Sequence, residues 1–170
     1  MNSLHYHSPV GTLCIAEDGN AIVYVTWAGT RQAPAETAEE ATPLLREAVR
    51  QLSEYFAGRR RTFDLPLAPQ GTAFQLRTWQ ALREIPYGQT RSYGQIAEAV
   101  GCPKGARAVG MANNRNPISI LMPCHRVIGA DGRLVGYAGG LDVKKQLLEL
   151  ERLSANGCME ADRDRPSGNA

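Results

Sequence analysis

The sequence predicts an α/β N-terminal domain followed by a mainly helical C-terminal domain that contains a helix-turn-helix. Two β-rich runs meet at a turn signal within the first thirty residues, and residues 64–71 form a linker that contains Pro and Gly. Beyond this linker, Gly and Pro divide the chain into short helices. Since 170 residues suffice for one domain or two small ones, we divide the chain into residues 1–70, residues 71–154 and a flexible tail of residues 155–170.

The N-terminal part begins with a hairpin and continues into a helix. Residues 12–16 and 21–27 are apolar, strand-forming runs on either side of the turn signal Asp18-Gly19-Asn20. Residues 31–41 are rich in Ala, Glu and Pro and are expected to form an exposed loop. A helix is predicted from Pro43 to Ala57, ended by Gly58. Its apolar residues recur at helical spacing: Leu44, Leu45, Ala48, Leu52, Tyr55 and Phe56.

Two capped helices are predicted after the linker. Thr72 can cap a helix of residues 73–85, which stops before Pro86 because the residue preceding a proline disfavours helical backbone. Ser92 can cap a short helix of residues 93–100, which the following glycine ends.

A third helix is predicted over residues 104–113, opened by Pro103, and it completes a helix-turn-helix with the helix before it. Small residues are frequent in it: Gly105, Ala106, Ala108, Gly110 and Ala112. Small side chains bury little surface but allow close approach to the backbone. These residues therefore fit either tight helix–helix packing or contact with a partner, and the pattern leaves both open.

The last predicted helix starts at Asp142 as its cap and runs to about Leu153. On a helical wheel, Glu151 lies about 80° from Val143 and falls inside the apolar arc. A carboxylate at that position needs a buried partner. Lys144 falls in the same arc, so a simple salt bridge or a solvent-facing glutamate is the alternative.

Charge is unevenly distributed along the chain. The net charge is only +2, but residues 77–133 hold eight basic and three acidic residues, while residues 1–70 hold six basic and eight acidic ones. The middle of the chain could therefore bind a polyanion, although a solvated basic face would give the same pattern.

The sequence carries no sign of a membrane span, a secretion signal or a metal site. No apolar run approaches the ~20 residues that a transmembrane helix needs, and the first residues lack the features of a signal peptide, so we expect a cytoplasmic protein. The cysteines form no CxxC pair and are expected to be thiols: Cys14, Cys102, Cys124 and Cys158. His5, His7 and Cys14 lack a fourth ligand, and we expect no metal and no cofactor.

The segment Pro123-Cys124-His125-Arg126 is the candidate reactive site. A cysteine beside His and Arg lies in an electropositive neighbourhood, which favours the reactive thiolate. If the backbone is extended, neighbouring side chains point to opposite faces, so His125 would reach Cys124 through a bridging water. A packed thiol beside a structural imidazole is the alternative reading of these residues.

The segment of residues 116–129 closely resembles the active-site signature of the O6-alkylguanine-DNA alkyltransferase family. The resemblance is strong over residues 71–153 and weaker before them, although Tyr55-Phe56-Ala57-Gly58 also fits. Further motifs match in order: Gly71-Thr72-Ala73-Phe74-Gln75, Ile85-Pro86-Tyr87-Gly88, Ser92-Tyr93-Gly94-Gln95-Ile96-Ala97, Ala106-Arg107-Ala108-Val109-Gly110 and Gly136-Tyr137-Ala138-Gly139-Gly140.

The resemblance implies a ribonuclease-H-like N-terminal domain, a C-terminal domain of winged-helix type and a role in direct-reversal DNA repair. Such a protein, a monomer when free, binds double-stranded DNA through the minor groove and flips out an O6-alkylguanine nucleotide. The alkyl group passes irreversibly to the protein in a single turnover, without a cofactor. The preferred alkyl group, activity on O4-alkylthymine and cooperative assembly on DNA stay open.

The resemblance also implies roles for individual residues at the reacting centre. Cys124 is the acceptor nucleophile, His125 acts through water to keep it as thiolate, and Glu151 orients His125. Asn116 braces the turn between the recognition helix and the active-site loop. Tyr93 drives extrusion of the nucleotide at the phosphate and donates a hydrogen bond to guanine.

Other residues are expected at the DNA and in the pocket. Arg107 is the finger that replaces the flipped base, with Ala106, Gly110 and Arg126 as further DNA contacts. The substrate pocket is expected to contain Tyr137, Ala138, Gly139 and Val127, with the Ala138 N–H near guanine O6. The run Asn113-Asn114-Arg115 departs from relatives, which often carry Gly there, and this leaves the end of the recognition helix open.

Two other classes of protein remain as alternatives. A non-catalytic binder of alkylated DNA would lack the acceptor cysteine, whereas Cys124 is present. A cysteine hydrolase would use the same Cys–His segment but needs an oxyanion hole, and turnover of esters or amides would identify it.

Overall fold

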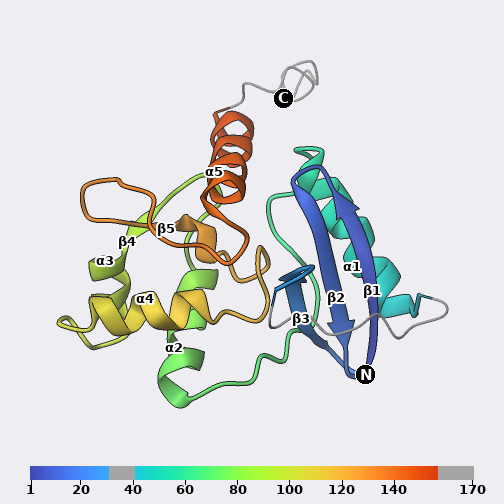
Figure 1. Ribbon diagram of the computed structural model, residues 1–170, viewed down its shortest axis with the longest axis horizontal. Coiled ribbons are helices and arrows are strands. Elements are labelled where there is room, and N and C mark those ends of the chain that lie inside the picture. Colours follow the sequence, from blue (N-terminus) through green and yellow to red (C-terminus); the bar gives the residue numbers. More distant parts are fainter. Residues whose placement is uncertain (31–40, 157–170) are drawn as a thin grey trace.

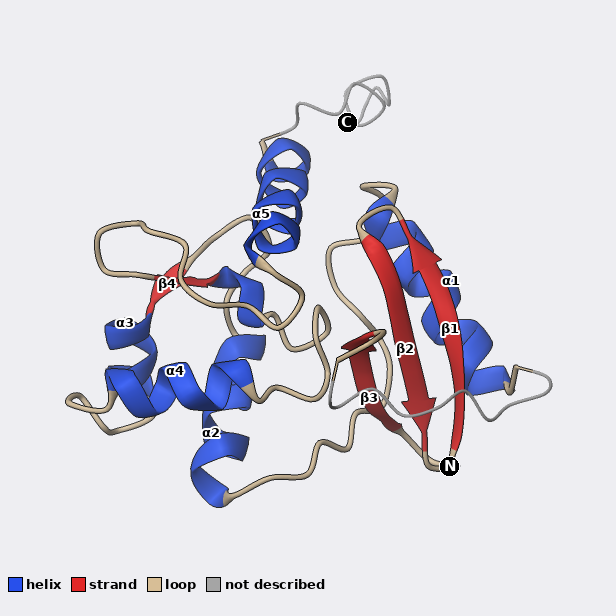
Figure 2. Cartoon of the chain, in the orientation of Figure 1, coloured by secondary structure: helices blue, strands red, loops and turns tan. Residues whose placement is uncertain are grey.

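A computed structural model describes residues 1–30 and 41–156. The three-stranded sheet and α1 form one half of the molecule, α2, α3 and α4 form the other, and α5 lies near the boundary (Figures 1 and 2). Most of the loop predicted for residues 31–41 and most of the predicted tail lie outside the described residues. The elements in chain order are β1 (Asn2–Ser8), β2 (Gly11–Glu17), β3 (Ile22–Trp27), α1 (Pro43–Phe56), α2 (Ala73–Arg83), β4 (Arg91–Ser92), α3 (Tyr93–Ala99), α4 (Ala106–Asn114), the 3-10 turn η1 (Cys124–Arg126), β5 (Val127–Ile128) and α5 (Leu141–Ala155).

The N-terminal sheet is antiparallel with the strand order β1-β2-β3. The predicted hairpin turn is confirmed: Oδ1 of Asp18 accepts hydrogen bonds from the backbone N–H groups of Asn20 and Ala21, both at 2.9 Å. β1 was not predicted as a separate strand. It is an edge strand whose exposed side carries His5 and His7, so its apolar signal is weak.

α1 packs its apolar side against the sheet and buries Leu45, Leu52 and Tyr55. The Thr42 side chain caps its first turn by accepting from the Leu45 N–H, and Gly58 follows its end with a φ of 77°. The helix thus ends one residue before the predicted Ala57, which is its C-cap.

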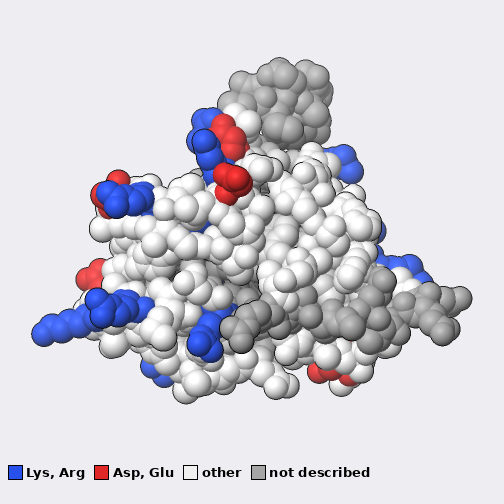
Figure 3. All heavy atoms as spheres, viewed as in Figure 1, with Lys and Arg blue, Asp and Glu red and all other residues white. Residues whose placement is uncertain are grey.

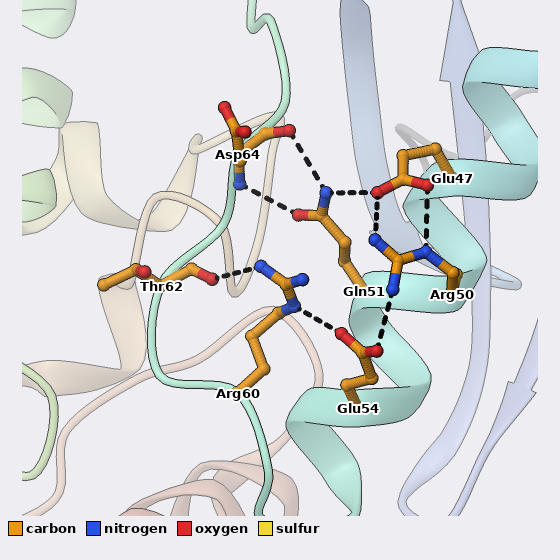
Figure 4. A network of polar contacts seen from close by, with 7 residues as sticks. All are labelled: Glu47, Arg50, Gln51, Glu54, Arg60, Thr62 and Asp64. Atoms are coloured by element: carbon orange, nitrogen blue, oxygen red, sulfur yellow. Dashed lines mark hydrogen bonds and ion pairs between the residues drawn. The ribbon is translucent and has the colours of Figure 1, made fainter.

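A polar network fastens α1 to the chain that follows it (Figure 4). The Gln51 side-chain amide pairs with the Asp64 backbone, donating to its carbonyl at 3.1 Å and accepting from its N–H at 2.9 Å. Arg60 donates to Glu54 at 2.8 Å and to the Thr62 carbonyl at 3.0 Å. The helix and the start of the linker therefore hold each other in place.

The helices of the C-terminal half begin where side-chain caps satisfy the first N–H groups. Thr72 and Ser92 cap α2 and α3 as predicted, each in a reciprocal capping box. α2 and α3 end one or two residues earlier than expected. α4 begins at Ala106, two residues later than predicted, because the chain turns at Gly105, whose N–H donates to the Cys102 carbonyl at 2.7 Å.

β3 connects the two halves of the molecule. The Val25 N–H donates to the Pro117 carbonyl at 2.9 Å, and the Ser119 N–H donates to the Val25 carbonyl at 2.8 Å. The Ile22 N–H donates to the linker at the Pro66 carbonyl at 2.8 Å. The last strand of the N-terminal sheet therefore supports the loop that leads from α4 to Cys124.

α5 begins at Leu141 with Gly140 as its N-cap, so the predicted cap residue Asp142 lies in the first turn instead. A carboxylate in the first turn still interacts favourably with the helix dipole. The helix continues to Ala155, two residues beyond the expected end. Within residues 1–30 and 41–156, no helix has the length and apolar character needed to cross a membrane.

Candidate active site at the domain boundary

Two very tight turns shape the loop that presents Cys124. At the first, Ile120 has a φ of 72° and the Leu121 N–H donates to the Ser119 carbonyl at 2.8 Å, which is a γ-turn with the rarer sign of φ. At the second, Pro123 has φ −77° and ψ 70°, and the Cys124 N–H donates to the Met122 carbonyl at 2.7 Å. A β-branched residue at positive φ is strained, and such strain occurs at functional sites.

The backbone from Cys124 to Arg126 forms the 3-10 turn η1. The extended backbone considered for Cys124 and His125 is therefore wrong. The inverse γ-turn at Pro123 leads directly into a turn closed by the Arg126 N–H donating to the Pro123 carbonyl at 3.0 Å. His125 consequently points toward α5.

Two asparagines hold this loop from the end of α4. Buried Asn116 donates to the Met122 carbonyl at 2.7 Å and accepts from the Ile118 N–H at 2.9 Å, which are the contacts expected of a brace. Asn113, in the last turn of α4, donates to the Cys124 carbonyl at 3.2 Å. This contact gives the unusual asparagine a structural reason that the sequence did not reveal.

The Cys124 side chain is only 3 % exposed. Burial raises the pKa of the thiol, while hydrogen bonding from Asn116 and Ser119 and the positive charge of Lys144 act in the opposite direction. The electropositive neighbourhood expected from adjacent Arg126 does not arise, because that arginine is paired with Glu151. The resting group is thus a thiol that must be deprotonated when it reacts.

A buried cluster surrounds the carboxylate of Glu151. Oε2 lies 2.7 Å from His125 Nε2 and accepts from the Tyr55 hydroxyl at 2.6 Å. Arg126 donates from Nε to Oε1 at 2.8 Å and from Nη2 to Oε2 at 3.0 Å. Glu151 is 1 % exposed, so the solvent-facing alternative is wrong and the need for a buried partner is confirmed.

The charges of this cluster are balanced locally. Burial alone would raise the pKa of Glu151, but the His125 charge and the hydrogen bonds from His125 and Arg126 hold it well below its usual range. Arg126 also donates to the Ile85 carbonyl at 2.8 Å and is buried. It therefore does not lie on the DNA-facing surface, and its assignment as a DNA contact was wrong.

Lys144 is a second buried cation, with 0 % of its surface exposed. Its Nζ donates to the carbonyls of Val135 at 2.9 Å and Gly136 at 3.3 Å. Burial lowers its pKa to about 8, against the opposing effect of Cys124. Tyr93 donates its hydroxyl to the same Val135 carbonyl at 2.9 Å, so α3 and α5 together hold the loop before Tyr137.

The four residues predicted to form the pocket lie in different environments. Val127 is buried at the start of β5, and Ala138 is exposed. Tyr137 lies near Cys124, and both burial and Cys124 raise its pKa well above its usual value. Gly139 is pressed against the indole of Trp27, where a Cβ would lie 2.6 Å from Nε1. Trp27 was predicted only as part of a strand, and no local pattern could have placed it here.

The outer face of α4 is open. Arg107 and Ala108 are exposed, and Met111 is 59 % exposed, whereas Val109 and Ala112 pack inward. Packing accounts for Gly110, where a Cβ would lie 3.8 Å from the Tyr93 ring, whereas Ala108 faces outward and leaves contact with a partner as a prediction. In the view of Figure 3, Lys and Arg side chains lie over this half of the molecule with fewer acidic ones among them.

These features define a class of protein: a two-part chain with an α/β half, a helical half and a buried cysteine thiol that directly precedes the histidine of a buried His–Glu pair. The comparisons with known proteins agree. The family model described as "6-O-methylguanine DNA methyltransferase, DNA binding domain" matches residues 73–153. The model of the ribonuclease-like domain of the same protein matches residues 4–69. The chain belongs to the O6-methylguanine DNA methyltransferase family, and its predicted α/β and helical DNA-binding architecture is confirmed.

Individual relatives are similar over nearly their whole length. The methylated-DNA–protein-cysteine methyltransferase of Methanosarcina acetivorans is 53% identical over 86% of this chain and 95% of the relative. The constitutive enzyme of that name from Bacillus subtilis is 50% identical, over 86% and 93%. The crystal structure of Mycobacterium tuberculosis OGT in complex with DNA has a TM-score of 0.82 and 45% identity, and the match covers 91% of this chain and 94% of that one.

Proposed function

We propose that this chain is a methylated-DNA–protein-cysteine methyltransferase that repairs O6-methylguanine in DNA by direct reversal. It takes the alkyl group onto Cys124 and is consumed in the process. The observation that carries the proposal is the position of this buried thiol, on a loop braced by Asn116 and next to the buried pair of His125 and Glu151. The same arrangement suits a nucleophile that is generated only inside a closed site.

The reaction is a displacement at a saturated carbon. The Cys124 sulfur forms a bond to the alkyl carbon, and the bond from that carbon to guanine O6 breaks. A guanine ring nitrogen takes up a proton from water, and the thiol proton that His125 has received is returned to water, so that one proton passes in net from the thiol to guanine. His125 receives the thiol proton through a water molecule. In support, its Nε2 faces Glu151, while its buried Nδ1 has no hydrogen-bond partner among the described residues. Glu151 then stabilises the imidazolium.

Two groups stabilise the guanine that leaves. Tyr93 donates a hydrogen bond to the base, for which its hydroxyl must exchange the Val135 carbonyl for the substrate. The backbone N–H of Ala138 lies near O6, where negative charge develops in the transition state. Tyr137 and Gly139 line the pocket beside them, with Val127 behind. Burial, together with the nearby Cys124, raises the pKa of Tyr93, which keeps this hydroxyl protonated and able to donate.

The chain binds DNA through α4. The exposed Ala108 and the half-buried Ala106 and Gly110 suit the minor groove of duplex DNA, with Ala106 and Gly110 near the DNA backbone. Arg107, exposed on the same helix, takes the place of the flipped nucleotide. We further propose a monomer in the free state, a cytoplasmic location, and a division into residues 1–70, residues 71–154 and a flexible tail from residue 155.

The proposal is tested with duplex DNA that carries O6-methylguanine labelled in its methyl group. The label should move to the protein, be found on the peptide that contains Cys124, and reach a plateau at one methyl per protein molecule. The product is a thioether, which has no carbonyl for water to attack, so the site has no route back to the thiol. Transfer that continues past this plateau would contradict a single-turnover mechanism, and label on another residue would contradict the site.

A further inference from the structure

One oxygen of Glu151, Oε2, binds partners from both halves of the molecule. Oε2 lies 2.7 Å from His125 Nε2, in the C-terminal half, and 2.6 Å from the hydroxyl of Tyr55, which belongs to α1 in the N-terminal half. Arg126 Nη2 is the third partner at 3.0 Å, so Oε2 joins two residues of the C-terminal half to Tyr55 of the N-terminal half. Since Tyr55 and Glu151 are 96 positions apart, this contact exists only when the two halves are packed together.

The Tyr55 hydroxyl is fixed in place. The residue is fully buried, and its ring packs edge-to-face against Phe56 at 5.2 Å and Tyr87 at 6.3 Å between ring centres. Phe63 covers another side at 5.6 Å. The network of Figure 4 fastens α1 to the linker through Gln51, one turn before Tyr55. The packed ring therefore fixes the direction of the hydroxyl, which points to Glu151.

We propose that Tyr55 is a positioning residue for the alkyl transfer proposed above, so that the N-terminal domain supplies a working part of the active site. Its hydroxyl holds Oε2 of Glu151 in place and takes up part of the carboxylate charge. It thereby sets where His125 sits and how strongly the carboxylate attracts the imidazolium that forms when Cys124 loses its proton. The inference rests on the proposed function.

The groups around Tyr55 and Glu151 determine the protonation state of the Tyr55 hydroxyl. Arg126 on η1 binds both oxygens of Glu151, and Tyr87, in the segment after α2, faces the cluster with Arg61 over its ring at 5.4 Å. Burial, followed by the negative charge of Glu151, raises the pKa of Tyr55 well above its usual value. The phenol therefore stays a hydrogen-bond donor throughout the range from pH 5 to 9 that is used in the test below.

The test is Tyr55→Phe in the full chain, with single-turnover rates of methyl transfer measured from pH 5 to 9. The loss of a hydrogen bond to a buried charged group should slow transfer about tenfold at neutral pH. Without the phenol, Oε2 keeps more charge for the imidazolium. The acid limb of the pH–rate profile should then move to higher pH by about half a unit to one unit. Affinity for duplex DNA should stay unchanged.

Two controls separate positioning from packing. Tyr6→Phe removes the hydroxyl of a half-buried tyrosine whose ring lies beside that of Phe56, outside the Glu151 cluster, and should leave rate and pH profile as they are. Fluorinated tyrosine at position 55 keeps the ring and the hydroxyl but makes the phenol a stronger donor. The acid limb should then move to lower pH, opposite to the shift in Tyr55→Phe. This second variant keeps the test decisive if Tyr55→Phe does not fold.

The outcomes are distinct. An acid limb that stays in place in both position-55 variants overturns the positioning role, whether or not the rate falls, because packing alone lowers the rate equally at all pH values. If the wild-type chain itself transfers no methyl group, the proposed function fails instead. Opposite shifts of the acid limb in the two variants support the inference.

Discussion

The buried centre around Glu151 and the outer face of α4 are built in opposite ways. At the centre, every oxygen of the carboxylate is engaged, and the partners come from α1 and from η1. On α4, Arg107 and Met111 project from the surface. Under the proposed function, the groups for chemistry are connected before DNA arrives, whereas the α4 face obtains its contacts from the DNA.

This difference has an energetic reason. A buried carboxylate is tolerated only when it is paired, so removing any partner of the cluster affects stability as well as chemistry. An exposed arginine has water as its alternative partner, so its removal affects only what it binds. Substitutions in the two regions should therefore separate into those that change transfer or folding and those that change only the use of duplex DNA.

The largest difference between methyl transfer and DNA binding is expected when Cys124 is replaced. Cys124→Ser should abolish methyl transfer, because a hydroxyl at neutral pH is a poor nucleophile toward an alkyl ether. Binding to duplex DNA should remain near wild type, since the α4 face is unchanged. Transfer is measured with labelled DNA and binding by fluorescence anisotropy. Full transfer activity in this variant would refute the assignment of the site.

The next largest effect is on the free energy of unfolding, when Glu151 loses its charge. Glu151→Gln leaves Arg126 buried without a counter-charge, and the loss of one member of a buried ion pair costs about 3–5 kcal/mol. Urea unfolding at pH 7 measures this loss. Glu149→Gln, which changes an exposed partner of Arg152 on the same helix, is the matched control and should leave the urea midpoint nearly unchanged.

The pH dependence of stability, compared between wild type and Glu151→Gln, tests the charge of the carboxylate. The pKa of Glu151 is depressed in the folded state, so its stabilisation is fully present above the usual value of 4.5 and is lost as the pH falls toward the folded-state pKa. The stability difference between wild type and Glu151→Gln should therefore shrink below about pH 4.5. A difference that is constant from pH 7 to pH 3 would mean that the carboxylate charge is not what stabilises the cluster.

On the α4 face, Arg107→Ala should slow repair of duplex DNA by roughly 10- to 100-fold, because the finger offsets part of the cost of flipping the base. Reaction with free O6-benzylguanine should change little, since no flipping is needed. Arg83→Ala, an exposed arginine at the end of α2, serves as the control. Equal losses of rate on duplex DNA and on free O6-benzylguanine would refute the finger role of Arg107.

The smallest effect is expected after the reaction. A methyl group on Cys124 must fit into a closely packed site, and overpacking costs about 1–3 kcal/mol. Calorimetry before and after one turnover should show a lower melting temperature for the spent protein. A spent form that melts at or above the temperature of the fresh one would show that the site has room for the product, and would weaken the contrast between a full centre and an open surface.

Local sequence determined most of the elements, because caps and turns are made by neighbours in the chain. Thr72 and Ser92 mark the starts of α2 and α3, and Asp18 marks the hairpin. The helical wheel of α5 also identified Glu151 as a carboxylate in need of a buried partner. The position of Asp142 was misjudged, since either Gly140 or Asp142 could start a helix there and only the path of the preceding loop decides between them.

What the sequence alone determined is thus the order of the helices and of strands β2 and β3, the candidate reactive segment around Cys124 and the need of Glu151 for a partner. Only the tertiary structure decided which residues bind the Glu151 carboxylate. Arg126 looked like a surface cation until folding placed it against Glu151, and Tyr55 looked like one more apolar residue of a helix. A long-range contact leaves no periodic signal, and charge in a sequence does not reveal whether a side chain faces water or a buried counter-charge.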